Sequence, residues 1–182
     1  MISSSVHVDT AVICELFDGL FRKRFSTCLR GGGDEPLYTP AVDDKLAVIT
    51  FRSDYVSSAL HEVSHWCLAG VERRALQDYG YWYQEDRDAK AQRGFEAMEA
   101  RPQALEWIFS LALGIRFVPS RDNFVVPASP YFDCEIPRQM MALVQGGLPA
   151  RAQAFANRLS QGRDYLRLAR DLAVNQLKAE FK

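Results

Sequence analysis

Residues 61 to 65 read His-Glu-Val-Ser-His, and this pattern limits the possible fold more than any other feature of the sequence. Two histidines four positions apart project from the same face of an α-helix, because four residues make slightly more than one turn. Both imidazoles can then bind one metal ion, with the intervening glutamate at the edge of that face. The sequence therefore predicts a helix from about residue 55 to residue 69 that carries His61 and His65 as metal ligands.

Histidine is scarce in the rest of the chain. The 182 residues include three histidines, and the third, His7, lies close to the N-terminus. The residues after His65 are Trp-Cys-Leu-Ala-Gly, so the HExxHxxGxxH pattern of a three-histidine site is not completed. Cys67 lies about 200° around the helix from His65 and is expected to be a core residue. The third ligand is therefore expected to be a carboxylate further along the chain.

Two carboxylates of suitable spacing occur in the segment Phe-Glu-Ala-Met-Glu at residues 95 to 99. Glu96 and Glu99 would lie one turn apart on one helical face, so that one could bind the metal and the other support it by hydrogen bonding. Two histidines and one carboxylate leave open positions on the metal, which suits catalytic zinc and also the facial triad of non-haem Fe(II) oxygenases. Glu62 would be the general base of a zinc hydrolase, whereas in an iron enzyme it would orient a ligand, a water or a substrate ammonium.

The remaining sequence predicts a mostly helical α+β fold, in which residues 1–182 form a single domain with a small β-sheet. The HExxH helix is expected in a zincin-like arrangement. Residues 46–51 are apolar and β-branched and predict a strand, and residues 31–40, with three glycines and two prolines, predict a loop. Pro102 is expected to begin a helix. Helices are thus predicted from Asp9 to Arg24, from Pro102 to Leu113, and near residues 138–144, 149–159 and 164–181.

Charge and cysteine content exclude several classes of protein. Lys and Arg number 22 and Asp and Glu number 23, so the net charge of -1 gives no reason to expect direct nucleic-acid binding or an anionic membrane surface. No stretch approaches the roughly 18 apolar residues of a membrane span, and the N-terminus does not follow a signal-peptide pattern. The four cysteines include no CxxC pair, as in a protein with reduced thiols. We therefore expect a cytoplasmic protein without a membrane partner.

Several segments together resemble the elongation factor P hydroxylase family. They are EPLYTPA at residues 35–41, HEVSHWCLAG at 61–70, DYGYWY at 78–83, DRDAKAQRGFE at 86–96 and RPQALEW at 101–107. The resemblance runs in order from about residue 16 to residue 113 and continues more weakly beyond. It implies a bacterial cytosolic enzyme that acts on elongation factor P, hydroxylating the lysine that carries an added β-lysyl group.

The resemblance also implies a set of metal ligands on a fold unlike the jelly-roll of common oxygenases. His61 and His65 match the family's two imidazole ligands, and the carboxylate aligns with Glu99, with Glu96 as the fallback. Hydroxylation of an unactivated carbon needs a redox-active metal, so Fe(II) is expected with dioxygen as cosubstrate, although zinc or another divalent ion could occupy the same ligands. The reductant must be external or a small cosubstrate, because the sequence has no dinucleotide or flavin motif.

An aromatic cluster follows the predicted metal helix. Tyr79, Tyr81 and Trp82, with acidic residues just after them, are predicted to bind the cationic side chain of the substrate through their ring faces. The competing interpretation is that these rings pack in the core or in a hairpin.

Two other functions fit the same residues. A zinc metallopeptidase of the gluzincin type would use His61, His65 and Glu99 as ligands and Glu62 as the base. The other is a binding module that uses a metal only for structure. It is disfavoured because structural zinc sites usually have four protein ligands.

Overall fold

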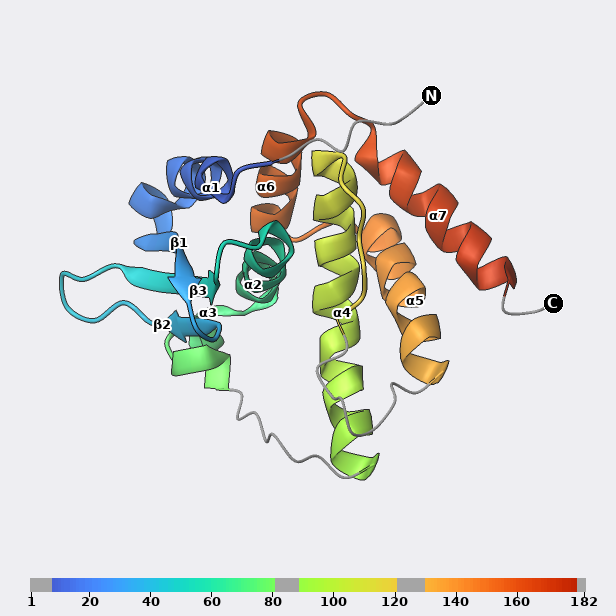
Figure 1. Cartoon of the computed structure of the whole chain (residues 1–182), viewed down its shortest axis with the longest axis horizontal. Helices are drawn as coiled ribbons and strands as arrows, with labels where there is room; N and C mark the ends of the chain where they lie inside the picture. The colour runs from blue at the N-terminus through green and yellow to red at the C-terminus, as the bar shows by residue number, and fades with distance from the viewer. Residues whose placement is uncertain (1–7, 81–88, 121–129, 180–182) are drawn as a thin grey trace.

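The computed structural model describes residues 8–80, 89–120 and 130–179. These residues form seven α-helices, one 3-10 turn and a three-stranded sheet, which confirms the predicted mostly helical α+β class (Figure 1). Within these ranges no helix is both long and apolar enough to cross a membrane. The helices are α1 (Thr10–Phe25), α2 (Val56–Leu68), α3 (Val71–Arg74), α4 (Ala89–Leu113), α5 (Pro130–Gly146), α6 (Ala150–Ser160) and α7 (Tyr165–Ala179); the strands are β1 (Thr27–Gly33), β2 (Leu37–Thr39) and β3 (Ala47–Arg52), and the 3-10 turn is η1 (Gln77–Gly80).

The sheet has the order β1-β3-β2, with β1 parallel and β2 antiparallel to β3. Strand β3 confirms the strand predicted at residues 46–51, but the loop predicted at residues 31–40 is wrong, because β1 extends to Gly33 and β2 occupies residues 37–39. A Cβ at Gly31 would lie 2.7 Å from the Phe51 ring, and one at Gly33 would lie 2.7 Å from Cγ2 of Thr50. The glycines are therefore part of a strand that passes too close to β3 to carry side chains.

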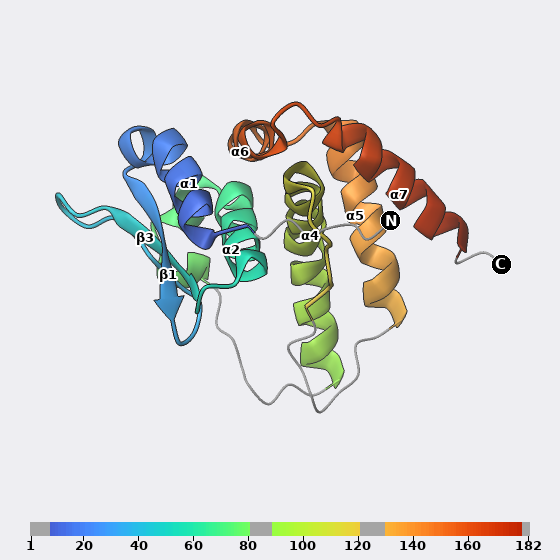
Figure 2. The same ribbon diagram turned by 45° about the horizontal axis from the view of Figure 1, so that its top comes forward.

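Helix α2 lies between the sheet and α4 in both views of the molecule (Figures 1 and 2). It buries a broad apolar face that includes Leu60, Val63 and Trp66, and Trp66 packs against the Phe17 ring of α1 with centroids 5.1 Å apart. Cys67 is 1% exposed, which confirms its prediction as a core residue. The apolar face of α2 thus packs on the sheet side of the core, and the face that carries His61 and His65 is directed toward α4.

Two arginines hold the C-terminal end of α2. Arg151 of α6 donates to three backbone carbonyls at this end, at 2.6 to 3.1 Å, and its guanidinium lies 4.8 Å from the Trp66 ring centroid. Arg74 donates to the carbonyl of Ala69 at 2.6 Å. The last carbonyls of a helix lack intrahelical donors and carry partial negative charge, so both guanidinium groups stabilise them. Helix α2 is therefore anchored within about one turn of His65.

Helix α4 is continuous through Pro102, which was expected to begin a helix. A proline inside a helix removes one hydrogen bond and costs about 3 kcal/mol. Here the helix buries residues on both sides of the proline, including Ala100, Leu105 and Ile108, against α2, α5 and α6, and this packing outweighs the cost. The prediction failed because local propensity was overridden by tertiary contacts. The consequence is that every acidic residue from 96 to 106 lies on one rigid element.

Candidate metal centre

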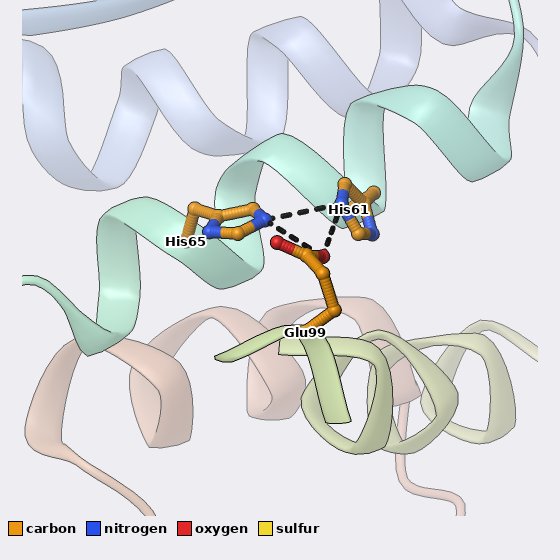
Figure 3. A group of neighbouring side chains, drawn as sticks. All are labelled: His61, His65 and Glu99. Carbon is orange, nitrogen blue, oxygen red and sulfur yellow. Dashed lines mark hydrogen bonds and ion pairs between the residues drawn. The ribbon is translucent and has the colours of Figure 1, made fainter. Parts of the chain in front are cut away.

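His61 and His65 of α2 face Glu99 of α4 (Figure 3). The two Nε2 atoms are 3.1 Å apart, and Oε2 of Glu99 lies 3.4 Å from each of them. The side chains of the three residues are 18%, 7% and 5% exposed. The structure therefore brings together the three residues that the sequence predicts as metal ligands, in a place largely shielded from water.

The spacing of these three atoms suits a bound transition-metal ion. Zinc and similar ions bind imidazole nitrogen and carboxylate oxygen at about 2.0 to 2.2 Å, so neighbouring ligand atoms at octahedral or tetrahedral angles lie roughly 3.0 to 3.5 Å apart. The observed separations of 3.1 and 3.4 Å fall in this range. Two imidazoles and one carboxylate are also a donor set that accepts zinc, iron and related ions. The three side chains fit the ion that the sequence predicts.

Burial and neighbouring side chains shift the pKa values of Glu99 and His61. Burial alone would raise the pKa of Glu99, but the adjacent His65 and His61, by charge and hydrogen bonding, hold it well below its usual value. Burial alone would lower the pKa of His61, yet hydrogen bonds and negative charge from Glu106 and Glu99 raise it well above its usual value. Glu99 is therefore ionised at neutral pH, as a metal ligand must be.

Glu106 is a functional candidate that the sequence reasoning missed. It lies on α4, seven residues after Glu99, is 4% exposed, and places Oε2 at 2.9 Å from Nδ1 of His61. Because the raised pKa of His61 favours the doubly protonated ring, a metal would have to displace the proton on Nε2. A carboxylate that accepts the Nδ1–H then keeps the ring in the form whose Nε2 lone pair can bind the metal. Spacing could have indicated Glu106, because residues seven apart share one face of a helix. The prediction that a new helix begins at Pro102 placed Glu99 and Glu106 on different helices, so this spacing was not considered.

Glu96 does not belong to the converging group. Among the described residues, the side chains that could hold one ion together are His61, His65 and Glu99. Glu96 is 1% exposed and accepts a hydrogen bond from Gln92 at 3.3 Å, one turn earlier on α4. The fold thus presents Glu99, rather than the fallback Glu96, to the two histidines.

The other predicted site residues lie in different surroundings. Glu62 is part-buried; burial raises its pKa, and the neighbouring His61 and His65 oppose this shift. Tyr79 is 4% exposed and stacks on Tyr38, so it is covered by protein. Tyr81 and Trp82 lie outside the described residues. The roles of Glu62 in catalysis and of the three aromatic residues in substrate binding stay predictions.

Comparison with known proteins decides the family. The family model for elongation factor P hydroxylase matches residues 16–171. This chain belongs to the elongation factor P hydroxylase family. It is also 42% identical over 153 residues to the elongation factor P lysine hydroxylase of Haemophilus influenzae, an alignment that covers 81% of this chain and 85% of that protein. The resemblance seen in the sequence is therefore confirmed.

The described parts of four segments that carry the family resemblance lie around the candidate metal centre. EPLYTPA contributes β2 with Tyr38, HEVSHWCLAG contributes α2, and the start of DYGYWY contributes Tyr79 in η1. RPQALEW lies on α4 and brings Glu106 to His61. Motifs that are far apart in the sequence of this elongation factor P hydroxylase family member therefore form one continuous region of the structure. The zincin-like placement of the HExxH helix stays a prediction.

Proposed function

We propose that this protein is a metal-dependent hydroxylase that acts on a lysine of elongation factor P. The observation that carries the proposal is the convergence of His61, His65 and Glu99, with ligand atoms 3.1 to 3.4 Å apart, in a member of this family. The name of the relative from Haemophilus influenzae, elongation factor P lysine hydroxylase, supports the choice of substrate. We further propose that the target lysine carries a β-lysyl group.

Fe(II) is the metal that we propose for His61, His65 and Glu99. Bound there, it would supply the redox chemistry with dioxygen that hydroxylation of an unactivated carbon requires, whereas zinc is redox-inert. The donor set supports this assignment, because two histidines and one carboxylate are typical of non-haem Fe(II) oxygenases. Electrons would come from an external reductant or a small cosubstrate. A protein that modifies a translation factor would work in the cytoplasm.

The side chains around the ligands prepare the site for this reaction. Glu106 holds the ring of His61 so that Nε2 points at Glu99, which fixes two ligand directions before a metal arrives. The low exposure of His65 and Glu99 keeps bulk water from the place where the metal would bind. We propose that Glu62, part-buried and adjacent to His61 in the chain, orients a water or an ammonium group of the substrate.

The decisive experiment compares metals on the modified substrate. The anaerobically purified protein is supplied with Fe(II) or with Zn(II), then with β-lysylated elongation factor P, oxygen and an external two-electron reductant, and the product is weighed. We expect a gain of one oxygen atom, about 16 Da, with iron alone. Glu99→Gln is the control that should not respond to iron. Cleavage of the substrate backbone with zinc would instead support a metallopeptidase of the HExxH type, with Glu62 as its base.

A further inference from the structure

The chain turns in an unusual way between α3 and the next described segment. Asp78, Tyr79 and Gly80 follow one another with φ values of 47°, 58° and 74°, all in the left-handed region. Glycine adopts this region freely, but aspartate is less suited to it and a tyrosine is disfavoured. Such backbone strain persists only where the surrounding structure holds it, and it is concentrated at functional sites. The left-handed conformation of residues 78–80 must therefore be held by contacts with neighbouring elements.

The turn is fastened to the edge strand of the sheet. Oδ1 of Asp78 accepts a hydrogen bond from the backbone N–H of Tyr38 at 2.7 Å, and Tyr38 lies in β2 paired with Ile49 of β3. The hydroxyl of Tyr38 donates to the carbonyl of Arg74 at 2.8 Å, at the end of α3. Both ends of the connection from α3 to η1 are thus tied to one residue of the sheet.

The strained turn places the Tyr79 ring between the sheet and the metal helix. Its ring stacks on Tyr38 with centroids 4.3 Å apart and planes 13° apart, and it lies nearly parallel to the His65 imidazole, with centroids 6.3 Å and planes 12° apart. Tyr38 and Tyr79 are 2% and 4% exposed. The buried hydroxyl of Tyr79 has no hydrogen-bond partner among the described residues. The contacts of this side chain are therefore made by its ring face.

We propose that Tyr79 is a positioning residue whose ring, held by the 78–80 turn, keeps the His65 imidazole in its metal-binding orientation. This inference rests on the proposed metal site. His61 is oriented by the carboxylate of Glu106, and on the other side of the pair His65 faces a ring fixed to the sheet through Tyr38. A ligand whose orientation is restricted in advance loses less entropy when the metal binds. The strained turn would thereby contribute to preorganisation of the site.

The test measures Co(II) binding, because Co(II) substitutes for zinc and iron and its visible spectrum reports ligand geometry. Purified full-length wild type, Tyr79→Phe and Tyr79→Leu are titrated with Co(II) in competition with a chromophoric chelator. Phenylalanine keeps the ring, so we expect its affinity to stay within about twofold of wild type. Leucine removes the ring face, and we expect Co(II) affinity to fall at least tenfold, with a changed visible spectrum. A loss of this size is typical when a residue that orients a metal ligand is replaced.

Two further comparisons separate positioning from general damage. Phe117→Leu removes a ring stacked on Trp107 at 5.0 Å, in a pair distinct from the Tyr38–Tyr79–His65 stack, and should leave Co(II) affinity unchanged. If Tyr79→Leu does not fold, the fallback variant is Asp78→Ala, which removes the side-chain acceptor for the backbone N–H of Tyr38. Asp78→Asn keeps an acceptor oxygen at this position and should restore Co(II) affinity.

The Co(II) titrations distinguish a failure of the positioning role of Tyr79 from a failure of the metal site. Wild-type affinity and spectrum in Tyr79→Leu, or in a folded Asp78→Ala, would overturn the positioning role while leaving the metal proposal intact. Equal losses of Co(II) affinity in Tyr79→Phe and Tyr79→Leu would assign the effect to the Tyr79 hydroxyl and overturn the inference that the ring positions His65. Failure of the wild-type protein to bind Co(II) would overturn the proposed metal site.

Discussion

Oε2 of Glu106 lies 2.9 Å from Nδ1 of His61, on the side of the imidazole opposite the nitrogen that faces Glu99. One helix, α4, thus carries a carboxylate on each side of the same histidine ring. Glu99 and Glu106 are 4% exposed, so neither of these charges is freely hydrated. Buried charges are retained only where they have partners, and here both carboxylates have the ring of His61 as one of theirs.

Replacing Glu106 should weaken metal binding while leaving the metal ligands in place. Glu106→Leu removes the acceptor for the Nδ1–H of His61, and we expect a metal affinity about 10-fold to 100-fold lower. Glu106→Gln keeps an acceptor oxygen but loses the charge, so its affinity should fall between those of the leucine variant and the wild type. Titration with Zn(II) against a chromophoric chelator measures both. Equal affinity in all three proteins would mean that Glu106 has no part in orienting the ligand.

The two neighbouring glutamates of α4 should differ sharply. Glu99→Gln replaces the carboxylate, whose Oε2 lies 3.4 Å from Nε2 of both histidines, with a neutral amide that binds metals weakly, and we expect tight metal binding to be lost. Glu96→Gln should retain the metal, because Glu96 is directed into a buried contact with Gln92. Metal content after dialysis, measured by elemental analysis, distinguishes them. Retained metal in Glu99→Gln together with loss in Glu96→Gln would transfer the ligand role to Glu96.

The arginine that caps α2 should be important for stability. Arg151→Ala removes hydrogen bonds to three carbonyls and the contact with the Trp66 ring, and we expect unfolding free energy to fall by about 2 to 3 kcal/mol. Arg170→Ala, at an exposed position of α7, is the matched control and should change it by less than about 0.5 kcal/mol. Urea unfolding followed by circular dichroism measures both. A similar small effect in the two variants would contradict the capping role.

Two glycine-to-alanine changes should have opposite effects. A Cβ at Gly33 would lie 2.7 Å from Cγ2 of Thr50 in β3 and 2.8 Å from the backbone carbonyl oxygen of Glu35, so β1 must shift, and we expect Gly33→Ala to destabilise the protein by about 1 to 3 kcal/mol. Gly19 is exposed in α1 with open space around it, and Gly19→Ala should stabilise by about 0.5 to 1 kcal/mol. Thermal unfolding of both variants checks the signs. A stable Gly33→Ala protein would show that β1 does not need its close approach to β3.

The thiol of Cys67 should be unreactive in the folded protein. Burial raises the pKa of Cys67 to about 12. At pH 8 only about one thiol in ten thousand would then be ionised, and the thiolate is the reactive form. We expect iodoacetamide at pH 8 to spare Cys67 in the native protein and to label it in urea, with peptide mass spectrometry as the measurement. Rapid native labelling at Cys67 would show that α2 opens readily.

The sequence predicted the helical face of the candidate metal site but not Glu106, the carboxylate that contacts His61. The four-residue spacing of His61 and His65 fixes their common direction, because a helix has few ways to place them. Glu99 required more than spacing: residues 96 and 99 are equivalent by local pattern, and the resemblance to a family separated them. Glu106 could not be found once Pro102 was treated as a helix start, since the two glutamates were then assigned to different helices.

Errors in the fold occurred where tertiary contacts override local preference. Glycines at 31 and 33 favour a loop by composition, yet the proximity of Phe51 and Thr50 makes them necessary in a strand. Pro102 disfavours a helix locally, and the burial of α4 among other helices compensates for it. Neither effect is visible before the partner elements are known, because both depend on residues distant in the sequence.

The proposed metal ligands lie on two different helices, α2 and α4, and this placement affects how the protein unfolds. An ion held by His61, His65 and Glu99 would join α2 to α4, which are separated by the stretch of chain between residues 65 and 99. Because the unfolded chain has no preformed site, the free energy of metal binding would add to the stability of the folded state. The seam between α2 and α4 would then be the first part of the core to loosen when a chelator removes the ion. Hydrogen exchange along these two helices would therefore report the loading state of the protein without any substrate.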